Sequence, residues 1–235
     1  MMLIPLLGRG QTPKNLYFEG NSFFDHNNAF NIPDKIMGIL NGVGLVYNSV
    51  NNAVSNATIA QAPGGGTNYM LYPPRLNTML NGKSPNSLKD IVVVFELIND
   101  LYYQIVQGGA TSSDNTYNNL ITYMNKVNGN GQSFIFNTCT PSSLSGIPNS
   151  YEPLRQQLND RLRWEFNIPT GTARIFRSRK YPNSIMCDIG ADPFMGFQGA
   201  SNNTGYYQPD GVHPNASTGA PYLANSYHVP AILMT

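Results

Sequence analysis

The sequence predicts an α/β domain with a mostly parallel central sheet, and three observations favour this class. Short apolar runs of β type alternate with longer segments of helical spacing between about residues 15 and 190. Residues 91–95 are five consecutive apolar residues, mostly β-branched, as in a central strand buried on both faces. The 235 residues, 41% of them hydrophobic, suffice for one domain or at most two, with a core that needs no disulfide framework or structural metal. We expect an N-terminal extension over residues 1–14 and the domain itself over residues 15–235.

The predicted strands are short segments in which apolar and β-branched residues gather between turn residues. They cover residues 15–19, 56–61, 91–97 and 133–138, with a weaker strand within residues 173–187. Because segments of helical character separate them, we expect these strands to run mostly parallel.

Helices are predicted where apolar residues recur every three or four positions. Residues 33–40 place Ile36, Ile39 and Leu40 on one face, with Pro33 in the first turn. Residues 113–127 and 151–166 carry longer stripes of the same kind, which we expect to face the core. A last helical segment is expected around residues 222–225. It follows an aperiodic stretch, residues 190–209, whose length is typical of a functional loop.

The composition excludes several classes of partner. Charged residues make up 11% of the chain, against about 25% in an average soluble domain, and about 30 asparagines supply polarity instead. The formal net charge of +1 provides no broad attraction for nucleic acid or anionic lipid. No apolar stretch approaches the ~20 residues that span a bilayer, and the apolar residues 1–7 make a poor signal peptide. The amide-rich, lysine-poor make-up favours an extracellular or virion-associated protein over a cytoplasmic one.

Three residues have the spacing of a hydrolytic serine site. Ser22 follows the first predicted strand, so we expect its hydroxyl at the carboxyl edge of the sheet, where α/β proteins place their ligands. Asp210 and His213 are three residues apart on one tight turn, with Gly211 between them. This spacing lets the aspartate bind Nδ1 of the histidine and stabilise the imidazolium that forms when Nε2 takes a proton from a serine.

Four short segments, in order along the chain, carry these and other polar residues. They are Phe18-Glu19-Gly20-Asn21-Ser22, residues 56–67, Phe95-Glu96-Leu97-Ile98-Asn99-Asp100 and Pro209-Asp210-Gly211-Val212-His213-Pro214. Together they resemble the sequence blocks of the SGNH, or GDSL-type, hydrolase family. The resemblance implies a three-layer α/β/α sandwich whose central sheet has about five mostly parallel strands. Two positions depart from the family pattern: Gly-Asn-Ser replaces Gly-Asp-Ser in the first block, and Leu97 stands where the third block usually has glycine.

The same resemblance implies a role for each candidate residue. Ser22 is the nucleophile, His213 the general base and Asp210 the acid that orients it. The oxyanion hole consists of the amides of Ser22 and Gly65 and the side chain of Asn99. Because three glycines are adjacent, Gly64 and Gly66 are alternatives to Gly65.

The implied activity is hydrolysis of short acyl esters, acetyl esters first among them, without a cofactor. Carbohydrate O-deacetylation is the preferred reaction, because the aromatic, amide-rich loop 194–207 suits sugar rings, and the partner is then a small-molecule or glycan ester. Two alternatives stay open. One is a weakly catalytic or non-catalytic binding or structural module of the same fold, which the two departures favour, and the other is an acyltransferase or lipase-type protein. No set of His, Cys and carboxylate residues has the spacing of a zinc site.

The remaining histidines and the cysteines have simpler interpretations. His26 follows Ser22 by four residues and competes for the role of base, but the better set of partners surrounds His213. His228 is expected to be a surface or core imidazole. Cys139 and Cys187 each follow a predicted strand, so they are either two buried thiols or a disulfide.

Overall fold

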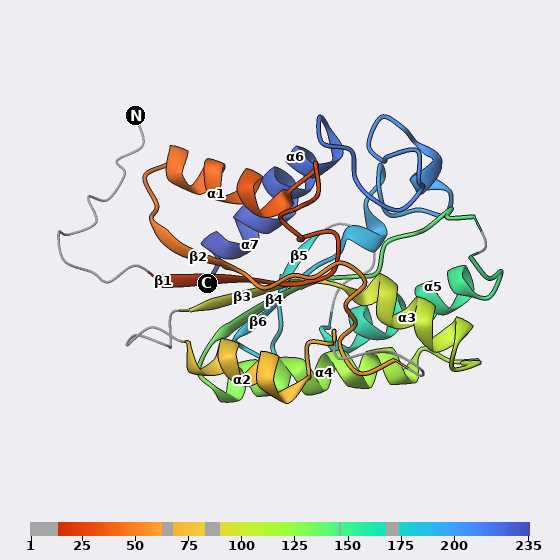
Figure 1. The fold of residues 1–235 in the computed structure, drawn as a ribbon, viewed down its shortest axis with the longest axis horizontal. Coiled ribbons are helices and arrows are strands. Elements are labelled where there is room, and N and C mark those ends of the chain that lie inside the picture. The colour runs from red at the N-terminus through yellow and green to blue at the C-terminus, as the bar shows by residue number, and fades with distance from the viewer. Residues whose placement is uncertain (1–13, 63–67, 83–89, 146, 168–173) are drawn as a thin grey trace.

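A single sheet forms the centre of the molecule. The computed structural model describes residues 14–62, 68–82, 90–145, 147–167 and 174–235. Over these residues six strands pair in the order β2-β1-β3-β4-β6-β5 (Figure 1). They are β1 (Lys14–Gly20), β2 (Tyr47–Asn51), β3 (Ile91–Phe95), β4 (Ser133–Asn137), β5 (Ile175–Arg177) and β6 (Ser184–Cys187). The β5–β6 pair is antiparallel, and the other pairs are parallel.

Helices cover both faces of the sheet. One face carries α1 (Ile32–Gly42), α6 (Gly219–Leu223) and α7 (Val229–Leu233), with the π-helical turn η4 (Ala224–His228) between the last two. The other face carries α2 (Pro73–Asn81), α3 (Leu97–Val106), α4 (Asp114–Gly129) and α5 (Tyr151–Glu165) (Figure 1). This arrangement is the expected three-layer α/β/α sandwich.

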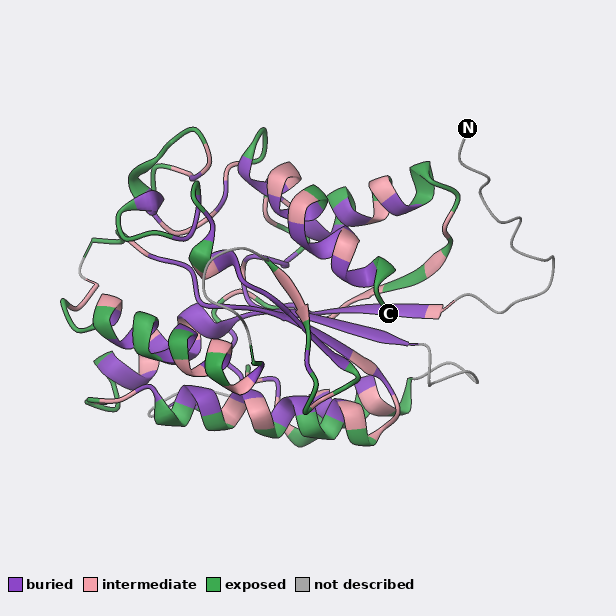
Figure 2. Cartoon of the chain, turned by 180° about the vertical axis from the view of Figure 1, so that it is seen from behind, coloured by how far each residue is buried: buried purple, intermediate pink, exposed green. Residues whose placement is uncertain are grey.

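The core lies along the central strands. All five residues of β3 are buried, and its Val93 is paired with Phe18 of β1 and Ile135 of β4. Figure 2 shows buried residues along the strands and on the inward helix faces, with exposed residues on the outer faces. Because β1, β3 and β4 run parallel, the segments that follow them emerge at one edge of the sheet, where a ligand site is expected.

Most of the predicted elements are confirmed, and one predicted strand is wrong. Residues 56–61 form a turn and bends, in which Thr58 makes an isolated bridge with Tyr69. The outer neighbour of β1 is instead β2, an edge strand with the sequence Tyr-Asn-Ser-Val-Asn, in which Asn48 and Ser49 are exposed and the other three residues are half-buried. Ile59 is fully buried, so the apolar character of this segment reflects packing rather than strand pairing.

The weak strand expected within residues 173–187 is two strands, β5 and β6. A short hairpin-like return places β5 antiparallel at the end of the sheet, so the sheet has one strand more than expected. Residue 173 lies outside the described residues.

Helix α3 begins almost immediately after β3. The predicted strand over residues 91–97 continued to Leu97, but the strand ends at Phe95 and the helix begins at Leu97. The Glu96 side chain caps the helix, because its Oε1 accepts a hydrogen bond from the Asp100 amide at 2.9 Å. Asn99 therefore lies in the first helical turn, not in a loop at a strand end.

The chain turns sharply after β1, and Gly20 makes this turn possible. Gly20 has a φ of +135°, and a Cβ at this position would lie 2.5 Å from the carbonyl oxygen of Phe95. Only glycine tolerates both the backbone conformation and the close approach to β3. The turn brings Ser22 to the carboxyl edge of the sheet.

Candidate active site

Ser22, His213 and Asp210 form a chain of hydrogen bonds at this edge. Ser22 Oγ lies 2.6 Å from His213 Nε2, although 191 positions separate the two residues. His213 Nδ1 lies 2.7 Å from Asp210 Oδ2. The His213 side chain is 24% exposed and that of Asp210 is 38% exposed, so solvent reaches the chain mainly at the aspartate. The structure thus brings together the serine, histidine and aspartate that the sequence singled out.

The Asp210 side chain also shapes the turn that carries His213. Its Oδ1 accepts hydrogen bonds from the amides of Val212 at 2.9 Å and His213 at 3.0 Å, leaving Oδ2 for the imidazole. Gly211 has a φ of +68°, and a Cβ there would collide with Ser143 Oγ. Partial burial acts to raise the pKa of Asp210, but the hydrogen bonds from His213 and Val212 outweigh it and hold this pKa below its ordinary value.

Asn99 is partly committed to a neighbouring loop. Its Nδ2 donates a hydrogen bond to the carbonyl oxygen of Ala57 at 3.1 Å, and the residue is half-buried. An amide nitrogen has a second hydrogen to donate, which is the hydrogen that an oxyanion donor requires. Gly65 and its alternatives Gly64 and Gly66 lie outside the described residues, so the second expected donor has no structural account.

Asn21 and Glu96 link the serine turn to Asn99, and no role was predicted for either residue from the sequence. Asn21 is fully buried; its Oδ1 accepts from the Phe23 amide at 3.0 Å, and its Nδ2 donates to the Glu96 carbonyl oxygen at 3.3 Å. The same carbonyl accepts from the Asn99 amide at 3.1 Å. The signal for Asn21 was the asparagine in Gly-Asn-Ser, because an amide can donate this bond and an ionised aspartate cannot.

Glu96 and Asp100 bring two buried carboxyl groups to the start of α3. Burial, and then the neighbouring Asp100 carboxyl, raise the pKa of Glu96 well above its ordinary value. Asp100 accepts hydrogen bonds from the amides of Ile59 at 3.2 Å and Ala60 at 3.3 Å, which anchors the loop after β2 to α3.

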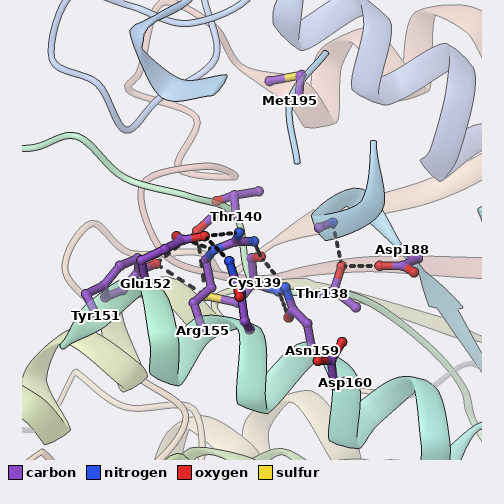
Figure 3. Close-up of polar contacts among 12 residues, drawn as sticks. Thr138, Cys139, Thr140, Tyr151, Glu152, Arg155, Asn159, Asp160, Asp188 and Met195 are labelled. Carbon is purple, nitrogen blue, oxygen red and sulfur yellow. Dashed lines mark hydrogen bonds and ion pairs between the residues drawn. The ribbon is translucent and has the colours of Figure 1, made fainter. Parts of the chain in front are cut away.

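A polar network on α5 supports the segment after β4 (Figure 3). Arg155 Nη1 and Asn159 Nδ2 donate to the Cys139 carbonyl oxygen at 3.1 Å and 2.9 Å. The Arg155 guanidinium is also paired with both carboxylate oxygens of Glu152. Four residues beyond Cys139, the Ser143 amide donates to the Gly211 carbonyl oxygen at 2.9 Å. The segment after β4 therefore contacts α5 at Cys139 and the histidine turn at Ser143.

The other histidines and the cysteines lie apart from this chain of hydrogen bonds. The side chain of His26 is 64% exposed and lies 4.0 Å from Asp25. His228 is fully buried, its Nε2 accepts from Asn137 Nδ2 at 3.0 Å, and burial lowers its pKa to about 3, so it is a neutral core imidazole. Cys139 and Cys187 are two buried free thiols, which settles the alternative left by the sequence. Burial raises the pKa of the Cys139 thiol to about 12.

Within the described ranges, no three His, Cys, Asp or Glu side chains gather as they would around a metal ion. The same residues include no helix with the length and apolar character needed to cross a membrane.

Solved structures of ester hydrolases are similar to this chain in fold. A GDSL-like lipase from Bacteroides thetaiotaomicron superimposes with a TM-score of 0.58 at 18% identity, covering 94% of this chain and 88% of its own. A variant of an acetyl xylan esterase from Geobacillus stearothermophilus has a TM-score of 0.58 at 16% identity, with coverages of 93% and 94%. The esterase EstA from a Pseudoalteromonas species has a TM-score of 0.56 at 11% identity, with coverages of 94% and 98%.

Sequence comparison adds no family assignment. No protein-family model matches the chain, and no curated protein matches it. At such identities the similarity concerns the fold alone, and on that ground the chain has the fold of the SGNH, or GDSL-type, hydrolases.

Proposed function

We propose that this protein is a serine esterase that hydrolyses short acyl esters. The observation that carries the proposal is the chain of hydrogen bonds from Ser22 through His213 to Asp210 at the carboxyl edge of the sheet. A histidine that binds a serine hydroxyl through Nε2 and a carboxylate through Nδ1 has the geometry of a general base.

The positions of these atoms support the following reaction, in which the oxyanion donors are those that the family resemblance implies. Ser22 Oγ attacks the acyl carbon while His213 Nε2 takes the hydroxyl proton, and Asp210 stabilises the imidazolium. The amides of Ser22 and Gly65 and the Asn99 side chain hold the oxyanion of the tetrahedral intermediate. The intermediate then releases the alcohol, which leaves with the proton from His213. Water attacks the acyl-enzyme in the same way and releases the acid and Ser22.

An aromatic cluster beside the histidine loop supports a carbohydrate as the alcohol part of the substrate. The rings of Phe194 and Tyr206 stack with centroids 5.2 Å apart, and Phe194 is 43% exposed. The Tyr206 carbonyl accepts from the Asn215 amide at 2.8 Å, two residues beyond His213. Exposed aromatic faces among amide side chains match the apolar faces and hydroxyls of sugars. An acetyl xylan esterase is among the fold neighbours, and we propose O-acetylated carbohydrate as the substrate class.

The first experiment measures turnover of a short-chain p-nitrophenyl ester by the wild type, Ser22→Ala and Ser112→Ala. Ser112 is a half-buried serine that precedes α4, so its variant controls for the loss of a hydroxyl. We expect Ser22→Ala to lose hydrolysis and fluorophosphonate labelling while keeping its circular dichroism spectrum, and Ser112→Ala to keep all three.

A folded wild type that neither hydrolyses the ester nor reacts with the fluorophosphonate would contradict the proposal and favour a binding module. Acetate release from acetylated glycans tests the substrate class. Ready cleavage of medium-chain acyl esters without any acetate release would argue for a lipase-type substrate. Ester formation with an added alcohol in preference to hydrolysis would indicate an acyltransferase.

A further inference from the structure

The His213 imidazole is packed against two phenylalanine rings from the segment that follows Ser22. The Phe30 ring stacks on it with centroids 5.1 Å apart and an interplanar angle of 23°. The Phe23 ring lies 5.3 Å away at an angle of 45°. Phe30 is 3% exposed and Phe23 is 1% exposed, so both are buried beneath the histidine rather than facing a substrate.

The hydrogen bonds between Asp210 and His213 join two residues of the same turn. A contact from another part of the chain is therefore needed to hold the imidazole in place relative to Ser22. The two residues are three positions apart, and their mutual hydrogen bonds fix the imidazole relative to its own turn but not relative to Ser22. The bond from the Ser143 amide to the Gly211 carbonyl positions the backbone of the turn only. Of the two rings that pack on the imidazole, Phe30 is the more nearly parallel to it, at 23° against 45° for Phe23.

Phe30 is held in turn by the segment that carries the nucleophile. Asn28 Nδ2 donates to the Ser22 carbonyl oxygen at 2.7 Å, and the Asn31 amide donates to the Asn28 carbonyl at 3.1 Å. Asp25 in the same segment accepts from the Ser55 hydroxyl at 2.7 Å, which ties the segment to the loop after β2. Ser22 and the ring that stacks on the imidazole therefore share one hydrogen-bonded loop.

We propose that Phe30 is a positioning residue for proton transfer between Ser22 and His213. Its ring holds the imidazole plane so that Nε2 stays aligned with Ser22 Oγ, and its negative π face stabilises the imidazolium that forms during attack. The inference rests on the proposed esterase function. It adds a residue that acts through the His213 imidazole.

The test compares Phe30→Leu with Phe30→Tyr, and with Phe166→Leu as a matched control. Phe166 is likewise 3% exposed and packs on an aromatic ring, that of Phe136 at 5.1 Å, on the opposite side of the sheet. Leucine keeps the apolar contact but removes the π face, and tyrosine keeps the face. We expect Phe30→Leu to lower kcat roughly 10- to 100-fold with KM unchanged, and to slow fluorophosphonate labelling equally. Phe30→Tyr retains more of kcat, and Phe166→Leu keeps kcat although it is destabilised to a similar extent.

A kcat for Phe30→Leu equal to that of Phe166→Leu would overturn the inference about Phe30. If Ser22→Ala is inactive in the same assay, the proposed esterase function still stands. Persistent turnover by Ser22→Ala would overturn the proposed function instead. NMR provides a readout that needs no turnover, because the His213 Nδ1 proton bonded to Asp210 is expected as a resolved downfield resonance. In Phe30→Leu this resonance should broaden through faster exchange. A resonance as sharp as in the wild type would contradict the positioning role.

Discussion

Asn99 uses one amide hydrogen on the Ala57 carbonyl, and Asn21 ties the serine turn to the start of the helix that bears Asn99. The Glu96 carbonyl oxygen accepts a hydrogen bond from the Asn21 side chain and another from the Asn99 backbone amide. Asn21, the residue before the proposed nucleophile, and Asn99, the proposed oxyanion donor, therefore donate hydrogen bonds to the same oxygen atom.

Asn99→Ala is expected to reduce kcat about 100- to 1000-fold, because on the proposed mechanism it removes a donor to the oxyanion of the transition state. It also removes the bond to Ala57, which costs about 1 kcal/mol of stability. Steady-state kinetics beside circular dichroism separates the two effects. Asn125→Ala, an exposed position on α4, is the control. Full activity of folded Asn99→Ala would remove this residue from the mechanism.

Single residues differ in how well the sequence predicts them. Asp210 and His213 were identifiable because their contact is local and three positions set it. Ser22 was identifiable because its strand is apolar and ends at a glycine. Phe30 was not, since its contact with His213 depends on the long loop that returns from the far end of the chain.

At the scale of elements, helix α3 starts on a carboxyl group that burial keeps protonated to an unusually high pH. Glu96 is 1% exposed, and Oε2 lacks a hydrogen-bond partner among the described residues. Its folded pKa lies well above the ordinary value of 4.5, so the folded state holds a proton that the unfolded chain releases. The free energy of unfolding therefore falls as pH rises above the unfolded pKa, until the folded pKa is passed.

Glu96→Gln is expected to flatten this decline, because a neutral amide keeps the capping oxygen and carries no charge. Urea unfolding at several pH values from about 5 to about 8 measures the slope. Glu152→Gln should behave oppositely. Although partial burial acts to raise the pKa of Glu152, Arg155 lowers it, so that variant loses stability at neutral pH. An unchanged slope in Glu96→Gln would contradict the account of a protonated Glu96.

The elements that the sequence missed have physical explanations. Strand β2 is an edge strand of mostly polar residues that are exposed or half-buried, so no apolar run marks it. Helix α3 was hidden because its first apolar residues continue the apolar run of β3, with Glu96 alone between them. Helices α1, α4 and α5 were predictable, since each buries one regular stripe against the sheet.

Across the whole molecule, Arg155 connects a helix layer to the edge of the sheet that carries the site. The residue is 2% exposed and bridges Glu152 and the Cys139 carbonyl. Four residues after Cys139, the Ser143 amide contacts the histidine turn. A guanidinium so buried is stable only because its donors are met by a carboxylate and a carbonyl oxygen.

Arg155→Met should lower the free energy of unfolding by about 2–4 kcal/mol, because it leaves Glu152 without its charge partner and removes a buried hydrogen bond. Arg161→Met is the matched control. Arg161 is paired with Asp114 at the surface, and breaking such a pair costs about 1 kcal/mol or less. Urea midpoints measure both. Equal losses in the two variants would show that the α5 network contributes no more than a surface ion pair.

The hydrogen bond between Ser22 and His213 can form only late in synthesis of the chain. The two residues are 191 positions apart, and at about 5–20 residues per second the ribosome adds His213 roughly 10–40 s after Ser22. All six described strands precede residue 188, so the sheet is complete in sequence before the Asp210–His213 turn exists. A nascent chain can thus contain Ser22 and all six described strands before Asp210 and His213 have been added. A translation product that stops short of residue 210 lacks both residues of the Asp210–His213 pair, so on the proposed mechanism we expect it to have no esterase activity.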